Sequence, residues 1–93
     1  MKSVRVLPSF ERSVRKLSSQ ERILLVKALG TFKDFILAGQ APFGFRLKKI
    51  DHDKYEFRVS LGLRVVIKED KTSYFLVLVG SHEAIKRYLR VVK

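Results

Sequence analysis

Two arginines and a glutamate in the middle of the chain are the first residues whose types and spacing suggest chemistry. Arg58 and Arg64 stand on either side of a short turn, and Glu56 precedes Arg58 by two positions. Residues 55–59 and 63–67 have the alternating pattern typical of β-strands with one polar face. If the two strands form a hairpin, Arg58 and Arg64 lie opposite each other on that face. Like charges in this position repel, so the pair is more readily explained if an anionic group lies over it.

The turn between these strands decides whether the two arginines share a face. We expect a three-residue loop, residues 60–62, whose glycine is left-handed and which pairs Val59 with Leu63. A two-residue loop would place Arg64 in the core, where an unpaired guanidinium is costly. The alternative to an anionic ligand is that Glu56 neutralises one arginine while solvent screens the other.

A second group of candidate residues lies in the last predicted helix. His82 begins this helix, and an imidazole there can act as an acid or a base near neutral pH. Tyr88 follows six residues later, so the two side chains do not share a helix face, and Tyr88 also suits a core position. Further basic residues that would contact phosphate, or would simply be solvated, are Lys48, Lys49, Lys54 and Arg87.

The composition favours a polyanionic partner. The 93 residues form one domain, residues 1–93, with a formal net charge of +11 and no cysteine. The positive charge is spread along the chain, which indicates binding to nucleic acid or to an acidic protein. No apolar run approaches the length of a membrane helix, and the N-terminus lacks the apolar core of a signal peptide. We therefore expect a cytoplasmic protein with no membrane partner.

Several common classes of catalytic site are missing from the sequence. It contains no glycine-rich phosphate loop, no cluster with metal-ligand spacing and no serine-nucleophile motif. We therefore expect neither a metal nor another cofactor, and any catalysis must come from the charged residues, the histidine and the tyrosine.

The periodicity predicts the order β-α-α-β-β-β-α, which is typical of a two-layer α+β domain. Its sheet would be built on an antiparallel meander of three strands, with an N-terminal helical hairpin packed on one face. A strand over residues 2–7 precedes a helix capped by Ser9. The capping box that begins at Ser18 starts the second helix, and Gly39 ends it. The remaining expected elements are strands at residues 55–59, 63–67 and 73–79, a helix at 82–91 capped by Ser81, and a possible short edge strand at 45–48.

The central and C-terminal segments resemble the RelE/ParE superfamily of toxins from toxin–antitoxin modules. The resemblance is carried by YEFRVSLGLRVV (residues 55–66) and YFLVLVGSHEAIKRYLR (residues 74–90), with LKKI (residues 47–50) before them. The segment VGSHEAIKRYL (residues 79–89) is similar to the C-terminal signature of the family. The likeness extends over nearly the whole chain, and the fold of this family is the α+β fold predicted above.

The resemblance implies a ribosome-dependent endoribonuclease that cuts mRNA in the ribosomal A site and is neutralised by an antitoxin. In that reaction the RNA 2′-hydroxyl attacks the adjacent phosphate, without a metal ion. By position, Arg58 and Arg64 correspond to a phosphate-stabilising pair and His82 to a general acid or base. Tyr88 corresponds to an aromatic residue that contacts the substrate. Glu56 takes the place of a lysine of RelE, so it is either the base or a partner of Arg58.

Two other functions remain open at this point. ParE-like members of the superfamily inhibit DNA gyrase without catalysis, and the joint presence of Arg58, Arg64, His82 and Tyr88 favours the ribonuclease branch instead. A basic RNA-binding module without catalysis is the third possibility, and it would bind naked RNA with strong salt dependence.

Overall fold

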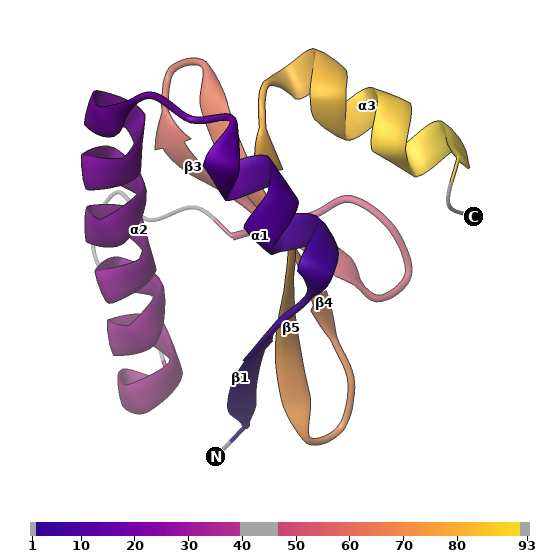
Figure 1. The fold of residues 1–93 in the computed structure, drawn as a ribbon. Helices are drawn as coiled ribbons and strands as arrows, with labels where there is room; N and C mark the ends of the chain where they lie inside the picture. The colour runs from indigo at the N-terminus through magenta and orange to yellow at the C-terminus, as the bar shows by residue number, and fades with distance from the viewer. Residues whose placement is uncertain (1, 40–46, 92–93) are drawn as a thin grey trace.

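The structure is a computed structural model, and it describes residues 2–39 and 47–91. Within these residues the fold is of the predicted α+β class, but helices cover both faces of a five-stranded sheet (Figure 1), so the last helix adds a layer to the two that were expected. None of the helices described has the length and apolar composition needed to cross a membrane. The elements in chain order are β1 (Ser3–Val6), α1 (Pro8–Arg15), α2 (Ser19–Ala38), β2 (Lys48–Lys49), β3 (Lys54–Ser60), β4 (Leu63–Glu69), β5 (Ser73–Gly80) and α3 (His82–Val91).

The sheet has the strand order β1-β5-β4-β3-β2. Strands β3, β4 and β5 form the predicted antiparallel meander, and β2 adds antiparallel to β3. β1 pairs with β5 in parallel, from Ser3 opposite Ser73 to Val6 opposite Leu76. β1 thus adds a parallel strand to the predicted antiparallel meander, and α1 and α2 lie in the long connection that a parallel pair requires.

The β3–β4 turn differs from the expected three-residue loop. Ser60 pairs with Leu63, so the turn has two residues, and the pairing of Val59 with Leu63 was wrong. Gly62 does not have a positive φ angle, since Gly39 is the only described residue that does. An irregularity between Arg58 and Ser60 absorbs one residue, in the manner of a β-bulge.

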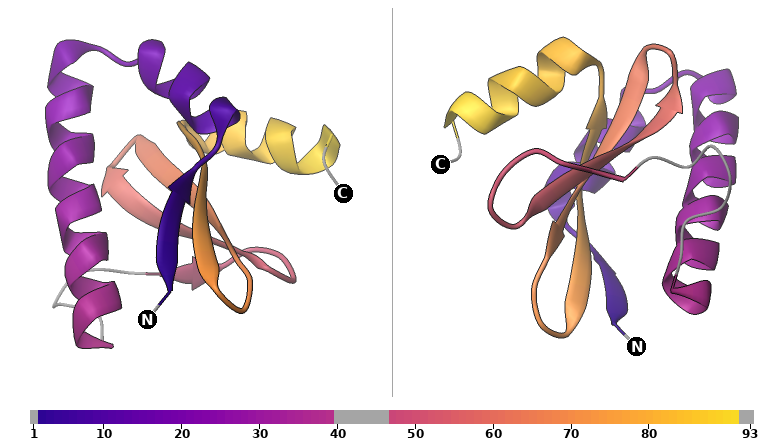
Figure 2. Two further views of the ribbon diagram at one scale, coloured as in Figure 1. Left: turned by 60° about the horizontal axis from the view of Figure 1, so that its bottom comes forward. Right: turned by 180° about the vertical axis from the view of Figure 1, so that it is seen from behind.

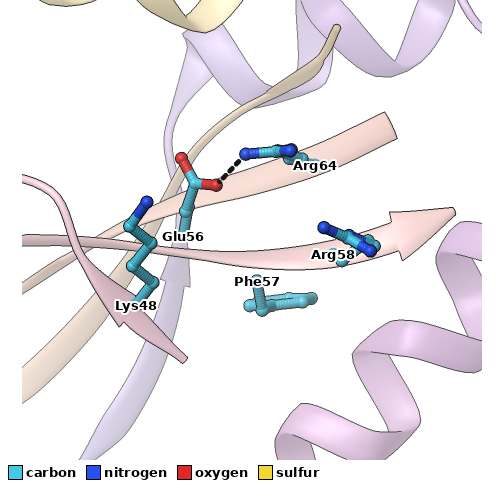
Figure 3. A pocket seen from close by; sticks show the side chains of 5 residues that line it. All are labelled: Lys48, Glu56, Phe57, Arg58 and Arg64. Atoms are coloured by element: carbon cyan, nitrogen blue, oxygen red, sulfur yellow. Dashed lines mark hydrogen bonds and ion pairs between the residues drawn. The ribbon is translucent and has the colours of Figure 1, made fainter. Parts of the chain in front are cut away.

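The bulge restores the alignment that the longer loop was expected to provide. Arg58 lies directly opposite Arg64, and both point to the polar side of the hairpin (Figure 3). The predicted pairing of the two arginines is therefore confirmed, although a different turn produces it.

The helix ends follow their local signals in three of four cases. The Ser18 capping box is complete, Gly39 ends α2 with φ 75°, and the Ser81 hydroxyl accepts a hydrogen bond from the Ala84 N–H. Ser9 is not the cap of α1, because the helix begins at Pro8 with Leu7 as its N-cap. The Ser9 hydroxyl instead donates a hydrogen bond to the Val77 carbonyl.

Two apolar clusters lie on opposite faces of the sheet. The larger cluster joins α1 and α2 to one face and includes Phe32, Phe57 and Val65. The smaller one joins α3 to the other face through Val66, Val77 and Ile85. In the larger cluster the Phe32 and Phe57 rings stack with centroids 5.2 Å apart, which ties α2 to β3.

The two N-terminal helices diverge across the sheet, as Figures 1 and 2 show. α1 contacts mainly β5 and α2 contacts mainly β3, so they make few contacts with each other. The expected helical hairpin is thus an open one. α1 also covers the edge of β5 beyond β1, where the buried Ser13 hydroxyl accepts a hydrogen bond from the Val79 N–H at 3.0 Å.

Candidate active site

A pocket lies on the face of β2, β3 and β4 that α2 does not cover. Its volume is about 370 Å³, and Figure 3 shows charged side chains from three neighbouring strands meeting around it. Phe57 is among the lining residues, although its side chain points to the opposite side of the sheet, into the core. The lining residues are Lys48, Glu56, Phe57, Arg58 and Arg64.

Strand alternation and register bring the charged residues to one side. Glu56 and Arg58 are two positions apart on β3 and therefore share a face. Lys48 of β2 pairs with Glu56, while Arg64 of β4 pairs with Arg58. The core contacts of Phe57, which points the other way, fix this orientation of β3.

Glu56 and Arg64 form an ion pair within the pocket. The Arg64 Nη1 donates to the Glu56 Oε2 at 2.6 Å, and the two side chains are 21% and 10% exposed. The structure thus matches the alternative in which Glu56 neutralises one arginine and solvent screens the other, with Arg64 and not Arg58 as the partner of Glu56. Glu56 faces Arg64 diagonally across the hairpin, where long side chains come within reach of each other.

Two cations of the pocket have no acidic partner. Within residues 2–39 and 47–91, neither Lys48 nor Arg58 forms an ion pair. Both side chains are exposed, so they can contact a ligand from solvent. The pocket thus combines a guanidinium held in place by a carboxylate with two cations available to an anion, an arrangement suited to a phosphate group.

The structure does not bring His82 into the pocket lining. His82 is exposed at the first position of α3, two residues after Gly80. Gly80 pairs with Arg64 on β4, and two residues span at most about 7 Å. The backbone of His82 therefore begins close to the end of the pocket formed by Arg64.

Tyr88 is half-buried and packs in the cluster beneath α3. That cluster contains Val66, which lies directly opposite Glu56 on the neighbouring strand. Tyr88 thus contributes to the core, as its spacing allowed, and lies beside the pocket rather than in its lining.

The other basic candidates do not line the pocket. Lys49 pairs with Tyr55, so it points to the opposite face from Lys48. The Lys54 ammonium is 3.2 Å from the Asp53 carboxylate and is mostly buried. Arg87 is exposed on α3. In this group, only Lys48 contributes to the lining of the pocket.

Sequence reasoning treated Lys48 as one of several peripheral lysines and missed its place next to Glu56. Neither the charge of Lys48 nor its position in the sequence indicates that it lies next to Glu56, because only a tertiary pairing brings the short β2 strand beside β3. Nothing in the described part of the chain groups three or more histidine or acidic side chains suitably for a metal ion.

No known protein-family profile matches this chain, and no curated protein is significantly similar to it in sequence. Solved structures do match it over most of its length. The RelB–RelE antitoxin–toxin complex from Methanococcus jannaschii aligns with a TM-score of 0.67 at 14% identity, covering 90% of this chain and 96% of that chain. YafQ from E. coli aligns with a TM-score of 0.66 at 11% identity, covering 91% and 98%.

The chain has the RelE-like toxin fold. A mutant of E. coli RelE in complex with a RelBc antitoxin peptide has 26% identity to the chain and a TM-score of 0.58, covering 99% of this chain and 95% of that chain. These matches confirm the resemblance to the RelE-like superfamily and the predicted fold class.

Proposed function

We propose that this protein is the toxin of a toxin–antitoxin module and that it cleaves mRNA in the A site of the ribosome. The observation that carries the proposal is the pocket itself, where Lys48 and Arg58 stand without acidic partners next to the Glu56–Arg64 ion pair. The RelE-like fold supports it, since the neighbours with this fold include toxins solved together with antitoxins.

The proposed reaction uses the RNA as its own nucleophile. The 2′-oxygen forms a bond to the phosphorus of the adjacent phosphate, while the bond from phosphorus to the 5′-oxygen breaks. The products are a 2′,3′-cyclic phosphate and a free 5′-hydroxyl. Negative charge increases on the phosphate oxygens in the transition state. Preorganised cations at those oxygens stabilise it more than they stabilise the ground state.

The cations of the pocket take complementary roles in this proposal. Arg58 and Lys48 contact the phosphate directly, because no carboxylate holds either of them. Arg64 contributes a third positive charge in an orientation fixed by Glu56. Glu56 is then a positioning residue rather than the base, since the Arg64 guanidinium already occupies one of its oxygens.

The reaction needs a base that takes the proton of the 2′-hydroxyl and an acid that gives a proton to the 5′-oxygen, and one of these two must lie at the edge of the pocket. His82 is the residue that we propose for this task, because the chain leads to it from the strand position beside Arg64. Tyr88 is proposed to contact a nucleotide from the adjoining cluster. Lys49, Lys54 and Arg87 are proposed to make peripheral contacts with the RNA backbone.

The ribosome supplies what the open pocket lacks. A pocket lined by side chains from one sheet face does not enclose an RNA strand or force its 2′-hydroxyl in line with the phosphate. A ribosome that holds the mRNA in a reactive geometry would provide this alignment. The proposed antitoxin, an acidic partner of this basic chain, would block the toxin in the neutral complex.

The test is cleavage of one defined mRNA on translating ribosomes, with the new 5′ ends mapped. Cuts at A-site codons are expected with the wild-type protein and not on naked RNA. Arg58→Ala and His82→Ala should each lower the rate by about 10²-fold or more. Arg15→Ala is the matched control, because it removes an exposed arginine of α1 away from the pocket.

Two results would overturn the proposal. Blocked DNA supercoiling with intact mRNA would identify a gyrase inhibitor. Salt-dependent binding to naked RNA without cleavage or growth arrest would identify an RNA-binding module. Equal cleavage rates for Arg58→Ala and Arg15→Ala would refute the role given to the pocket.

A further inference from the structure

Helix α2 has apolar residues on two faces, of which one packs on the sheet and the other is exposed. The packed face belongs to the larger core cluster, in which Leu25 and Phe32 are buried. On the outer face, Ile23 and Val26 are each 69% exposed and Leu37 is 57% exposed. A helix with apolar residues all round is typical of a buried position, so the outer face of α2 has the composition of a contact surface.

The residues along the outer face have the spacing of a helix–helix contact. Three and four residues separate, in turn, the members of the series Ile23, Val26, Gly30, Lys33 and Leu37. This is the spacing of the contact line in a two-helix coiled coil. Figures 1 and 2 show α2 at one side of the molecule in every view, with its outer face turned away from the sheet.

Gly30 lies at the middle of this contact line and is exposed. Apart from its chain neighbours and the backbone of its own helix, no described atom lies within 4 Å of the position that a Cβ would take there. Glycine inside a helix is unfavourable relative to alanine, and packing within the described residues does not require it here. The missing side chain lets a second helix approach the backbone closely, so the position fits a contact between helices.

We infer that the outer face of α2 binds the same face of a second copy of this chain, with the two helices antiparallel. A two-fold axis then pairs Val26 of each copy with Leu37 of the other. In the same register, Lys33 of each copy lies over Gly30 of the other. Its aliphatic stem covers the glycine while its ammonium reaches solvent.

Two charged residues beside the contact line favour this register. Lys27 and Asp34 flank the line on one side and are exposed. Neither forms an ion pair among the described residues. When Val26 pairs with Leu37, Lys27 of each copy comes next to Asp34 of the other. The dimer therefore gains two identical ion pairs at positions that set the orientation of paired helices.

The other arrangements of two α2 helices bring like charges together. In a parallel pair, Lys33 of one copy meets Lys33 of the other on the contact line, and Arg22 lies beside Lys27. In an antiparallel pair shifted by one heptad, Lys27 of one copy lies beside Lys27 of the other. Like charges at such positions are destabilising, so the charges of α2 select one register.

The net charge of the chain, +11, opposes contact between two copies. α2 itself contains three basic and two acidic residues among its 20 positions, so little of that charge lies at the contact. At about 0.15 M salt, charges elsewhere on the two copies are screened over about 8 Å. One pair of helices buries less surface than most stable dimers do. We therefore expect a dimer whose population rises with protein concentration.

The experiment measures the mass of the whole protein by analytical ultracentrifugation over a range of concentrations. Lys27→Asp and Asp34→Lys should each raise the dissociation constant of the dimer by about tenfold or more, because each change places like charges together twice. The double variant Lys27→Asp/Asp34→Lys exchanges the two charges and should return to within about threefold of the wild type. This return separates a lost contact from a lost fold.

The matched control is Lys86→Asp. Lys86 is exposed on α3, which packs on the opposite face of the sheet. The substitution changes the net charge as much as Lys27→Asp does, and it should not weaken the dimer.

Cysteine cross-linking tests the register, since the chain has no cysteine of its own. Val26→Cys and Leu37→Cys proteins are oxidised separately and as a mixture. Cross-links should form mainly between the two variants, because the antiparallel register brings positions 26 and 37 of different copies within reach of a disulfide. In a parallel dimer, each variant would cross-link to itself.

A protein that stays monomeric at every concentration would overturn the proposal. An unchanged dissociation constant in Lys27→Asp would also overturn it, as would cross-links confined to identical variants. The pocket of Lys48 and Arg58 lies on the face of the sheet that α2 does not cover, so the dimer leaves it open. Because the measurement needs neither ribosomes nor RNA, its result is independent of the cleavage assay.

Discussion

Replacing Arg58 and Arg64 separately by alanine should have different effects on stability. The two arginines are opposite each other on the same face, and the sequence alone treats them as an equivalent pair. In the structure only Arg64 holds a carboxylate, that of Glu56 at 2.6 Å. Arg64→Ala therefore removes the partner of a nearly buried charge, whereas Arg58→Ala removes an exposed cation and relieves a like-charge contact.

The burial of the ion pair sets the magnitude. The Glu56 side chain is 10% exposed, and losing one partner of a fully buried pair costs about 3–5 kcal/mol. Arg64 is 21% exposed and Lys48 remains opposite Glu56, so both lower the cost. We expect Arg64→Ala to cost about 2 kcal/mol, a fall in Tm of about 8–16 °C for a domain of this size. Arg58→Ala should change the free energy of unfolding by less than about 0.5 kcal/mol.

The assay combines thermal unfolding followed by circular dichroism with the ribosome cleavage assay. Both variants should lose about 10²-fold or more in cleavage rate, but only Arg64→Ala should melt early. A double-mutant cycle with Glu56→Ala should give a coupling energy of about 1–3 kcal/mol for the Glu56–Arg64 pair. The same cycle between Glu56 and Arg58 should give a value near zero.

Equal losses of stability in the two variants would refute this reasoning. So would a Glu56–Arg64 coupling energy near zero, because the ion pair would then contribute nothing. Glu56→Gln retains an oxygen that accepts a hydrogen bond from Arg64. If this variant is as stable as the wild type but loses cleavage together with the acidic limb of the pH profile, Glu56 is the base and not a positioning residue.

Two further predictions concern the scaffold. Ser13→Ala removes the acceptor of the buried Val79 N–H and should cost about 1–3 kcal/mol in chemical denaturation. The exposed Ser19→Ala is its control, and an equal loss there would contradict the role of Ser13. Hydrogen bonds from the Thr72 and Ser73 N–H groups lower the pKa of Asp70 below 3.8. Its carboxylate thus stabilises the fold above that pH, and the effect is lost as the pH falls through the folded-state pKa. The Tm difference between wild type and Asp70→Asn should shrink accordingly in acid, and a constant difference would contradict this.

Local patterns were sufficient for much of the framework. Alternation along β3 and β4 identified both strands and the face that carries Glu56, Arg58 and Arg64, because side-chain direction in a strand depends only on position. The ends of α2 followed from the capping box and from Gly39, since these signals act within a few residues of the helix end. That the two arginines share a face was predicted from a loop that the structure does not have, and the bulge between Arg58 and Ser60 is what brings them there.

Tertiary structure decided which of these residues interact. The bulge beside Val59 and the parallel pairing of β1 depend on contacts between segments far apart in the chain, which no local periodicity encodes. The same contacts place Lys48 beside Glu56 and bring the Glu56 carboxylate to Arg64 rather than Arg58. The grouping of Glu56, Arg58 and Arg64 was thus predicted from the sequence, whereas the place of Lys48 was not. Which cations remain available to a phosphate was decided by strand register, because a carboxylate can neutralise only the arginine that the register brings within reach.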